Sequence, residues 1–128
     1  MKLLFVFFVL RKNLVSKQPA IYSKEDRFAI HRFKTDESYL VGEGKGPIQA
    51  YLDIDSIIKI AKDANVDAIH PGYGFLSESP ELAEQCEKND ITFIGPSKEI
   101  LKRFGNKTEA KKVAEEAKVG TVPSVLVT

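Results

Sequence analysis

The sequence predicts an α/β domain in three layers, with helices on both faces of a mainly parallel sheet of about four or five strands. The first observation is an alternation along the chain. A helical pattern over residues 54–64 precedes a short apolar strand at 66–69, and another over 80–88 precedes a strand at 91–94. Such alternation favours a parallel sheet with right-handed crossovers. The second observation is an unbroken apolar run over residues 3–10, which is typical of a strand covered on both faces.

The composition fits one soluble globular domain. The chain has 128 residues, of which 43% are hydrophobic and 29% are charged, and this length is enough for a substantial core. The net charge is +1, which gives no reason to expect a polyanionic partner. Because basic and aromatic residues do not interleave along one stripe, we expect no nucleic-acid binding.

Cys86 is the single cysteine of the chain. One cysteine cannot form an intramolecular disulfide, so the chain fits a reducing compartment. Cys86 shares a helical pattern with Leu82 and Ala83. We therefore interpret it as a small core residue rather than as a nucleophile.

The apolar run at residues 3–10 has two interpretations. It is too short to cross a bilayer, which requires about 20 residues. Lys2 before an apolar run is also typical of a signal peptide, but Arg11 and Lys12 follow where a cleavage site needs small residues. Length and flanks favour a buried parallel strand over a targeting signal, and there is no clear transit peptide.

The next stretch predicts two short strands and two loops. Residues 20–23 read as the end of a strand, residues 24–29 as a charged loop, and residues 37–41 as another strand. The glycine-rich segment at 42–47 predicts a flexible surface loop. It superficially resembles a phosphate cradle, but it lacks the Walker spacing and the final Lys-Ser/Thr pair.

The helices carry start and stop signals. Asp53 is placed to cap the helix at residues 54–64. Pro80 occupies the favoured first position of the helix at 80–88. A short helix is predicted to begin after Ser97 and to end at Gly105.

The last predicted helix begins at Asn106, which pairs with Glu109 as in a capping box. Lys107 lies in its first turn, where a cation is unfavourable to the helix dipole. A bound phosphate would offset that cost, and the alternative is an ordinary exposed lysine. Residues 118–128 are expected to form a frayed tail or a short strand.

The candidate functional site is the sharp break after the strand at 66–69, where Pro71 cannot donate a hydrogen bond to a β-ladder. The residues of this stretch that carry chemistry are His70, Gly72, Tyr73, Gly74 and Glu78. The two glycines permit positive φ and close approach of another group to the backbone. In open α/β sheets, ligands bind at the carboxyl ends of the strands. The alternative is a structural turn that joins a strand to a helix.

Longer blocks of sequence indicate a family. The segment NVDAIH at residues 65–70 runs into HPGYGFLSE at 70–78, with His70 in both, and FIGP comes later at 93–96. Together these blocks resemble the amino-terminal, pre-ATP-grasp domain of the biotin carboxylase component of biotin-dependent carboxylases. Residues 31–42 and 50–54 most resemble the pyruvate carboxylase branch of that family. The similarity extends over residues 20–117.

The resemblance implies a role within a longer enzyme. The family uses ATP and Mg²⁺ to activate bicarbonate and to carboxylate a biotin carried on a separate domain. In pyruvate carboxylases the carboxyl group then passes from biotin to pyruvate. It implies that residues 70–78 line a cleft near the biotin and the nucleotide. It also implies that Lys107 contacts ATP, although the sequence here is Phe-Gly-Asn-Lys where the family has Phe-Gly-Asp-Lys. The family's metal and bicarbonate ligands lie in later domains, so we expect no catalytic and no metal-binding residue in this chain.

The resemblance is incomplete at both ends. Residues 5–19 lack the family's glycine-containing turn and first helix, and a frameshift, an alternative start or a faulty gene model would each produce this pattern. We expect residues 1–105 to form the biotin carboxylase-like domain, with residues 1–19 divergent. Residues 106–128 are expected to begin the link to an ATP-grasp domain that the chain does not contain.

Two functions remain open, and a secreted or membrane-tethered fragment is a third possibility. The first is the amino-terminal part of a biotin-dependent carboxylase, inactive alone, with the ATP-grasp and biotin carrier domains as partners and a homo-oligomer as a further option. The second is a stand-alone, non-catalytic α/β module that binds another subunit. The first implies the cytoplasm, or the mitochondrial matrix in a eukaryote, and no membrane partner.

Overall fold

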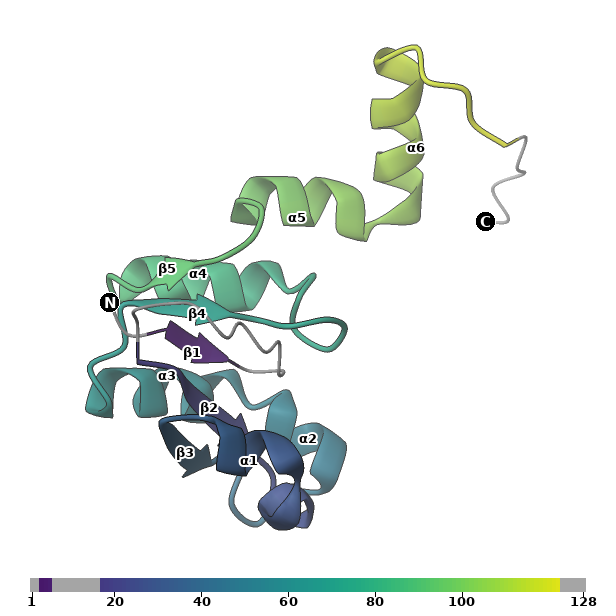
Figure 1. The fold of residues 1–128 in the computed structure, drawn as a ribbon. Coiled ribbons are helices and arrows are strands. Elements are labelled where there is room, and N and C mark those ends of the chain that lie inside the picture. Colours follow the sequence, from purple (N-terminus) through teal and green to yellow (C-terminus); the bar gives the residue numbers. More distant parts are fainter. Residues whose placement is uncertain (1–2, 6–16, 123–128) are drawn as a thin grey trace.

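The computed structural model describes residues 3–5 and 17–122 (Figure 1). Its strands form one sheet in the order β3-β2-β1-β4-β5, and every neighbouring pair is parallel. The strands are β1 (Leu3–Phe5), β2 (Pro19–Tyr22), β3 (Glu37–Leu40), β4 (Ala68–His70) and β5 (Thr92–Phe93). This order belongs to doubly wound sheets, in which the direction of growth reverses between β1 and β4. The predicted fold class is confirmed.

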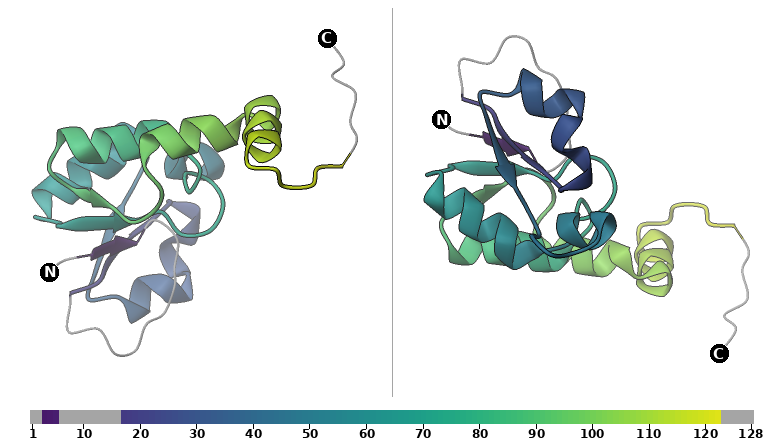
Figure 2. Two further views of the ribbon diagram at one scale, coloured as in Figure 1. Left: turned by 90° about the horizontal axis from the view of Figure 1, so that it is seen from above. Right: turned by 90° about the horizontal axis from the view of Figure 1, so that it is seen from below.

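Helices lie on both faces of the sheet (Figure 2). Helices α3 and α4 cover one face, and α1 lies on the other beside β2 and β3. Helix α5 packs against α4, and α6 extends from the end of α5. The helical segments are η1 (Glu25–Phe28), α1 (Ile30–Lys34), α2 (Pro47–Tyr51), α3 (Ile54–Asp63), α4 (Pro80–Lys88), α5 (Lys98–Gly105) and α6 (Lys107–Glu116). Within the described ranges, none is long and apolar enough to span a membrane.

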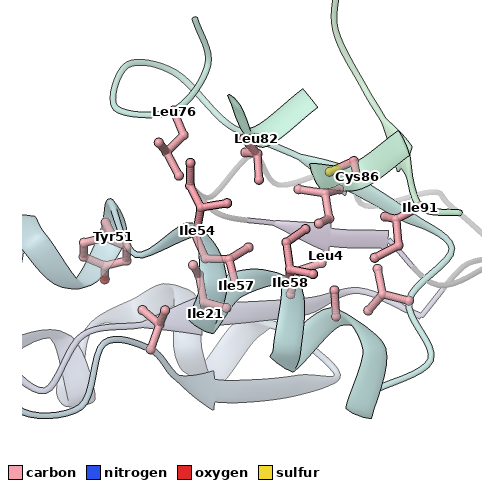
Figure 3. Packing of buried hydrophobic residues seen from close by; sticks show 14 of the residues in the cluster. Leu4, Ile21, Tyr51, Ile54, Ile57, Ile58, Leu76, Leu82, Cys86 and Ile91 are labelled. Carbon is pink, nitrogen blue, oxygen red and sulfur yellow. The ribbon is translucent and has the colours of Figure 1, made fainter. Parts of the chain in front are cut away.

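The main core lies between the sheet and helices α3 and α4 (Figure 3). Large side chains from adjacent strands, Leu4, Ile21 and Ile69, are completely buried there. Their small neighbours Ala20 and Ala68 form a separate buried pair, because successive residues of a strand point to opposite faces. Burial of each large aliphatic side chain contributes about 1.5–3 kcal/mol, so this face supplies most of the stabilisation. The predicted strand at 3–10 is confirmed for Leu3–Phe5, and residues 6–10 lie outside the described part.

Two predicted strands begin too early, because their first residues close a helix instead. The amide of Val66 donates to the carbonyl of Ala61 over 2.8 Å, and the amide of Ile91 donates to the carbonyl of Cys86 over 3.0 Å. The residue before each, Asn65 or Asp90, has a positive φ. This is the Schellman arrangement, in which an apolar residue follows a left-handed one. The strands therefore begin only at Ala68 and Thr92.

The sequence analysis also missed three short helices. The charged loop predicted at residues 24–29 contains η1, where the amide of Asp26 donates to the carbonyl of Ser23 over 3.1 Å. Helix α1 follows at once, and α2 begins at Pro47, which had been included in a loop. Proline at a first helical position is a known start signal. These segments are only four or five residues long, which is too short for an apolar period to show.

Candidate functional site

The loop at residues 70–78 lies where the doubly wound sheet reverses. Strand β4 pairs with β1 and ends at His70, and the loop projects beyond that carboxyl end (Figure 1). The crevice outside such a reversal is the usual ligand site of these folds. The structure thus places the predicted site residues of the loop at the position where the fold favours a ligand.

His70 is held by the backbone of its own loop. The amide of Gly72 donates a hydrogen bond to Nδ1 of His70 over 3.0 Å. In a neutral imidazole this arrangement puts the proton on Nε2. The half-buried ring therefore supports the turn.

Three residues of the loop have left-handed backbones. The φ angles are 76° at Gly72, 80° at Gly74 and 42° at Phe75. A Cβ added to Gly74 would meet no atom within 4 Å. Glycine is therefore required at residue 74 by its φ angle, while the space beside it is open to another molecule or domain.

The polar groups of the site are exposed. Tyr73 is 92% exposed, and Glu78 borders a cavity of about 270 Å³ between the end of the loop and α5. The cavity is lined by Ser77, Glu78, Pro96, Ile100, Leu101, Phe104 and Gly105. The structure thus brings Glu78 to the carboxyl end of α5.

Lys107 is an exposed residue at the start of α6, two positions after Gly105, and it does not line that cavity. The side chain of Asn106 accepts from the amide of Thr108 over 2.9 Å, which confirms the predicted N-cap. The carboxylate of Glu109 instead accepts from Nζ of Lys112 over 3.0 Å. The predicted capping box is therefore wrong in its second half, because an ion pair along the helix engages the glutamate.

Beneath the loop lies a polar network that sequence analysis missed. The hydroxyl of Tyr51 donates to Oδ2 of Asp26 over 2.6 Å and accepts from the amide of Ser23 over 3.0 Å. Burial, followed by the hydrogen bond to Asp26, raises the pKa of Tyr51 to about 12. The only sequence signal was the position of Tyr51 inside a block shared with the family, because its partners are 25 and 28 residues away.

Cys86 is a core residue, as predicted. Its side chain is completely buried, and burial raises the pKa of the thiol to about 11. A thiol that stays protonated at neutral pH is a poor nucleophile. The structure therefore supports the packing role.

The glycine-rich segment at residues 42–47 borders a larger cavity, of about 500 Å³. Its lining includes Lys45 and the carboxylates Asp53, Asp55 and Glu81. Nζ of Lys45 lies 2.7 Å from Oδ2 of Asp53. An acidic surrounding opposes a phosphate, so the interpretation as an ordinary loop is favoured over a phosphate cradle. Gly42 is nevertheless buried against α2, so that end of the segment is packed rather than flexible.

Asp53 gives the fold a dependence on acid pH. Its Oδ1 accepts from the amide of Ser56, which confirms the predicted cap of α3, and Oδ2 accepts from the Ser56 hydroxyl. The hydrogen bond from Lys45, with those from Ser56, lowers the pKa of Asp53. The ionised form is therefore favoured by folding, and its contribution is present above the unfolded pKa of about 3.9 and lost as pH falls through the folded value.

We expect Asp53→Asn to remove the charge and keep the cap. The variant should be less stable than the parent at pH 7, and the difference should shrink as the pH falls through the lowered pKa of Asp53 in the folded parent. Asp53→Ala removes the cap as well and should cost about 1 kcal/mol more at neutral and at acid pH. Urea denaturation across pH measures these differences. Asp63→Asn removes an exposed carboxylate from the same helix, and an equal pH dependence in that control would contradict the prediction.

Comparison with known proteins identifies the same family from a family model and from individual relatives. A family model described as "Biotin carboxylase, N-terminal domain" matches residues 10–101. Pyruvate carboxylase of Bacillus subtilis is 59% identical over 104 residues, which are 81% of this chain and 9% of that protein. Human mitochondrial pyruvate carboxylase is 53% identical over 104 residues, again 81% of this chain and 9% of that protein. The chain thus spans 9% of the length of these curated relatives.

Solved structures agree with the sequence relatives. The complete multifunctional pyruvate carboxylase of Rhizobium etli superimposes with a TM-score of 0.84 and 41% identity, over 98% of this chain and 13% of that chain. The biotin carboxylase domain of a thermophilic 2-oxoglutarate carboxylase bound to bicarbonate gives a TM-score of 0.85 and 35% identity, over 95% of this chain and 29% of that one.

Proposed function

Because the chain belongs to the family of biotin carboxylase N-terminal domains, we propose that it is the amino-terminal domain of a carboxylase of the pyruvate carboxylase type. The longer enzyme uses ATP, Mg²⁺ and bicarbonate to carboxylate biotin, and pyruvate is the final acceptor. The observation in this molecule that carries the proposal is the loop at residues 70–78, which lies at the reversal of the doubly wound sheet.

The part played by this domain is to form one wall of the cleft. The open space beside Gly74 admits a flat ring close to the backbone, and Tyr73 and Glu78 offer an aromatic face and a carboxylate. These features fit a biotin ring, whose nitrogen accepts the carboxyl group when biotin is bound. Lys107 supplies a cation for a nucleotide phosphate at the start of α6.

The described residues do not fit Mg²⁺. Within residues 3–5 and 17–122, no three His, Cys, Asp or Glu side chains lie close enough together to hold a metal ion. We therefore assign the metal and the phosphoryl chemistry to other domains of the longer enzyme. The work of this chain is binding and orientation, which can account for large rate factors without a catalytic group.

The proposal has consequences for organisation. Residues 1–105 form the domain, and residues 106–128 begin the connection to an ATP-grasp domain, which together with a biotin carrier domain is the partner. Assembly of the longer enzyme as a homo-oligomer belongs to the same proposal. The compartment is the cytoplasm, or the mitochondrial matrix in a eukaryote. The name of the human relative places that enzyme in mitochondria.

The test is a chimaera in which this chain replaces the matching region of the Bacillus subtilis enzyme. We expect it to carboxylate pyruvate with ATP and bicarbonate, whereas the 128-residue chain alone should not turn over ATP.

Tyr73→Ala in the chimaera should lower kcat/KM about tenfold, an energetic loss of about 1.4 kcal/mol, without a change in Tm because the side chain is exposed. Glu78→Gln should also lower kcat/KM, and Lys107→Gln should raise the KM for ATP.

Phe33→Ala is the matched control, because Phe33 is a 70% exposed aromatic residue on α1. Gly74→Val is a weaker test, since a φ of 80° strains any side chain there. Equal kinetics for Tyr73→Ala, Glu78→Gln and Phe33→Ala would show that the loop is a structural turn. A folded chimaera without activity would favour the stand-alone module.

A further inference from the structure

The ring of Tyr51 has almost no freedom in the structure. It lies at the end of α2 and is 6% exposed. Its hydroxyl donates to Asp26 and accepts from the amide of Ser23, so both functions of the hydroxyl are used. Asp26 is held in turn by the hydroxyl of Ser23, which donates to the same Oδ2 over 3.2 Å.

The same ring contacts the loop at residues 70–78. The ring centroids of Tyr51 and Phe75 are 5.9 Å apart, and their planes are inclined by 36°. Figure 3 shows Tyr51 at the same end of the core as Leu76, a buried residue of that loop. Tilted aromatic pairs at this separation attract each other beyond the area they bury.

Phe75 needs such support. Its φ of 42° is left-handed, an unfavourable region for a bulky side chain. Residues held in this region persist where their surroundings fix them. Two hydrogen bonds close the turn that depends on Phe75. The amide of Ser77 donates to the carbonyl of Gly74 over 2.9 Å, and the amide of Ser79 donates to the carbonyl of Leu76 over 3.1 Å.

The contacts cross the reversal of the sheet. Ser23 follows β2, and Phe75 follows β4. Both strands pair with β1, one on each side. Tyr51 thus joins the segments after the two neighbours of β1, at the carboxyl end where the candidate site lies.

On the premise that this loop serves the function proposed above, we propose that Tyr51 is a positioning residue, which acts through Phe75 to set the conformation of residues 72–78 and the placement of Tyr73. Tyr51 does not touch the reacting groups. Its hydroxyl fixes the ring, and its ring fixes the loop.

The first arm of the test uses the full 128-residue chain. Tyr51→Leu removes the ring and should raise the exchange rate of the Ser77 and Ser79 amides at least about tenfold relative to global opening. Tyr51→Phe keeps the ring and should give a smaller increase. Val66→Ala is the control. Val66 is buried just before β4, so its truncation should lower global stability and leave the exchange of the Ser77 and Ser79 amides relative to global opening unchanged.

The second arm places the same variants in the chimaera. We expect Tyr51→Leu to lower kcat/KM as Tyr73→Ala does, Tyr51→Phe to restore most of the activity, and Val66→Ala to leave kcat/KM near the parent value. Unchanged exchange at Ser77 and Ser79 in Tyr51→Leu would overturn the positioning role whatever the activity. Faster exchange with full activity would also overturn it if Tyr73→Ala still lowers kcat/KM, and the proposed function would stand. If Tyr73→Ala is silent too, the positioning role is overturned because Tyr73 needs no placement, whereas the proposed function fails only if the folded chimaera itself is inactive.

Discussion

Replacement of Gly42 by alanine is expected to cost about 2–5 kcal/mol, the sum of overpacking and of a left-handed backbone. An added Cβ would lie 2.3 Å from Cα and 2.6 Å from Cβ of Ala50. These atoms belong to α2, so the clash cannot be relieved by rotation of a flexible side chain. The φ of 61° adds strain of its own. Domains of this size have about 5–15 kcal/mol of stability, so much of it would be lost.

Gly44 provides the matched control. Its φ is 80°, yet an added Cβ would meet no atom within 4 Å. Gly44→Ala therefore carries the backbone strain without the clash and should cost about 1–2 kcal/mol. Urea denaturation of both variants measures the difference. If both lose the same stability, α2 does not pack on Gly42 as the structure describes.

Replacement of Ile57 by alanine is the second change with a large expected effect, about 2–5 kcal/mol. Ile57 is completely buried between α3 and the sheet, and its removal leaves a cavity that the rigid strands cannot fill. The free energy of unfolding from urea titration gives the loss. As an independent readout, the buried thiol of Cys86 should react faster with a thiol reagent, since it is reached only through opening.

The control for Ile57 is the same change at Ile48, which is 56% exposed on α2. Ile48→Ala should change stability by less than about 1 kcal/mol, because little apolar area leaves a buried environment. A similar loss in both variants would contradict the assignment of the core to α3 and the sheet.

Much of the fold was predictable because its signals are local. The helix over Ile54–Asp63 follows from a cap at Asp53 and an apolar period, and the helix at Pro80–Lys88 follows from its first proline. Alternation of these helices with apolar segments indicated a parallel sheet, which the structure confirms. The strand starts at 66 and 91 were wrong because Val66 and Ile91 are apolar whether they pair in a sheet or close a helix.

The site was predictable in part for the same reason. His70, Gly72 and Gly74 mark a break in the chain that any local analysis finds, and the structure confirms positive φ at both glycines. The roles of Tyr73, Glu78 and Lys107 toward biotin and a nucleotide stay predictions. Local sequence does not show which group will approach an exposed side chain.

The sequence by itself determined the α/β class, the main helices with their caps, the break at His70 and the family. Only the tertiary structure decided that the break lies at the reversal between β1 and β4, that Gly42 packs on α2, and that Tyr51 joins Ser23 to Phe75. Caps, turns and periodicity arise from forces between residues a few positions apart, so one stretch of sequence carries them. Strand order and the contacts of Tyr51 arise between residues 15 or more positions apart, and they are defined only once packing of the whole core selects one arrangement.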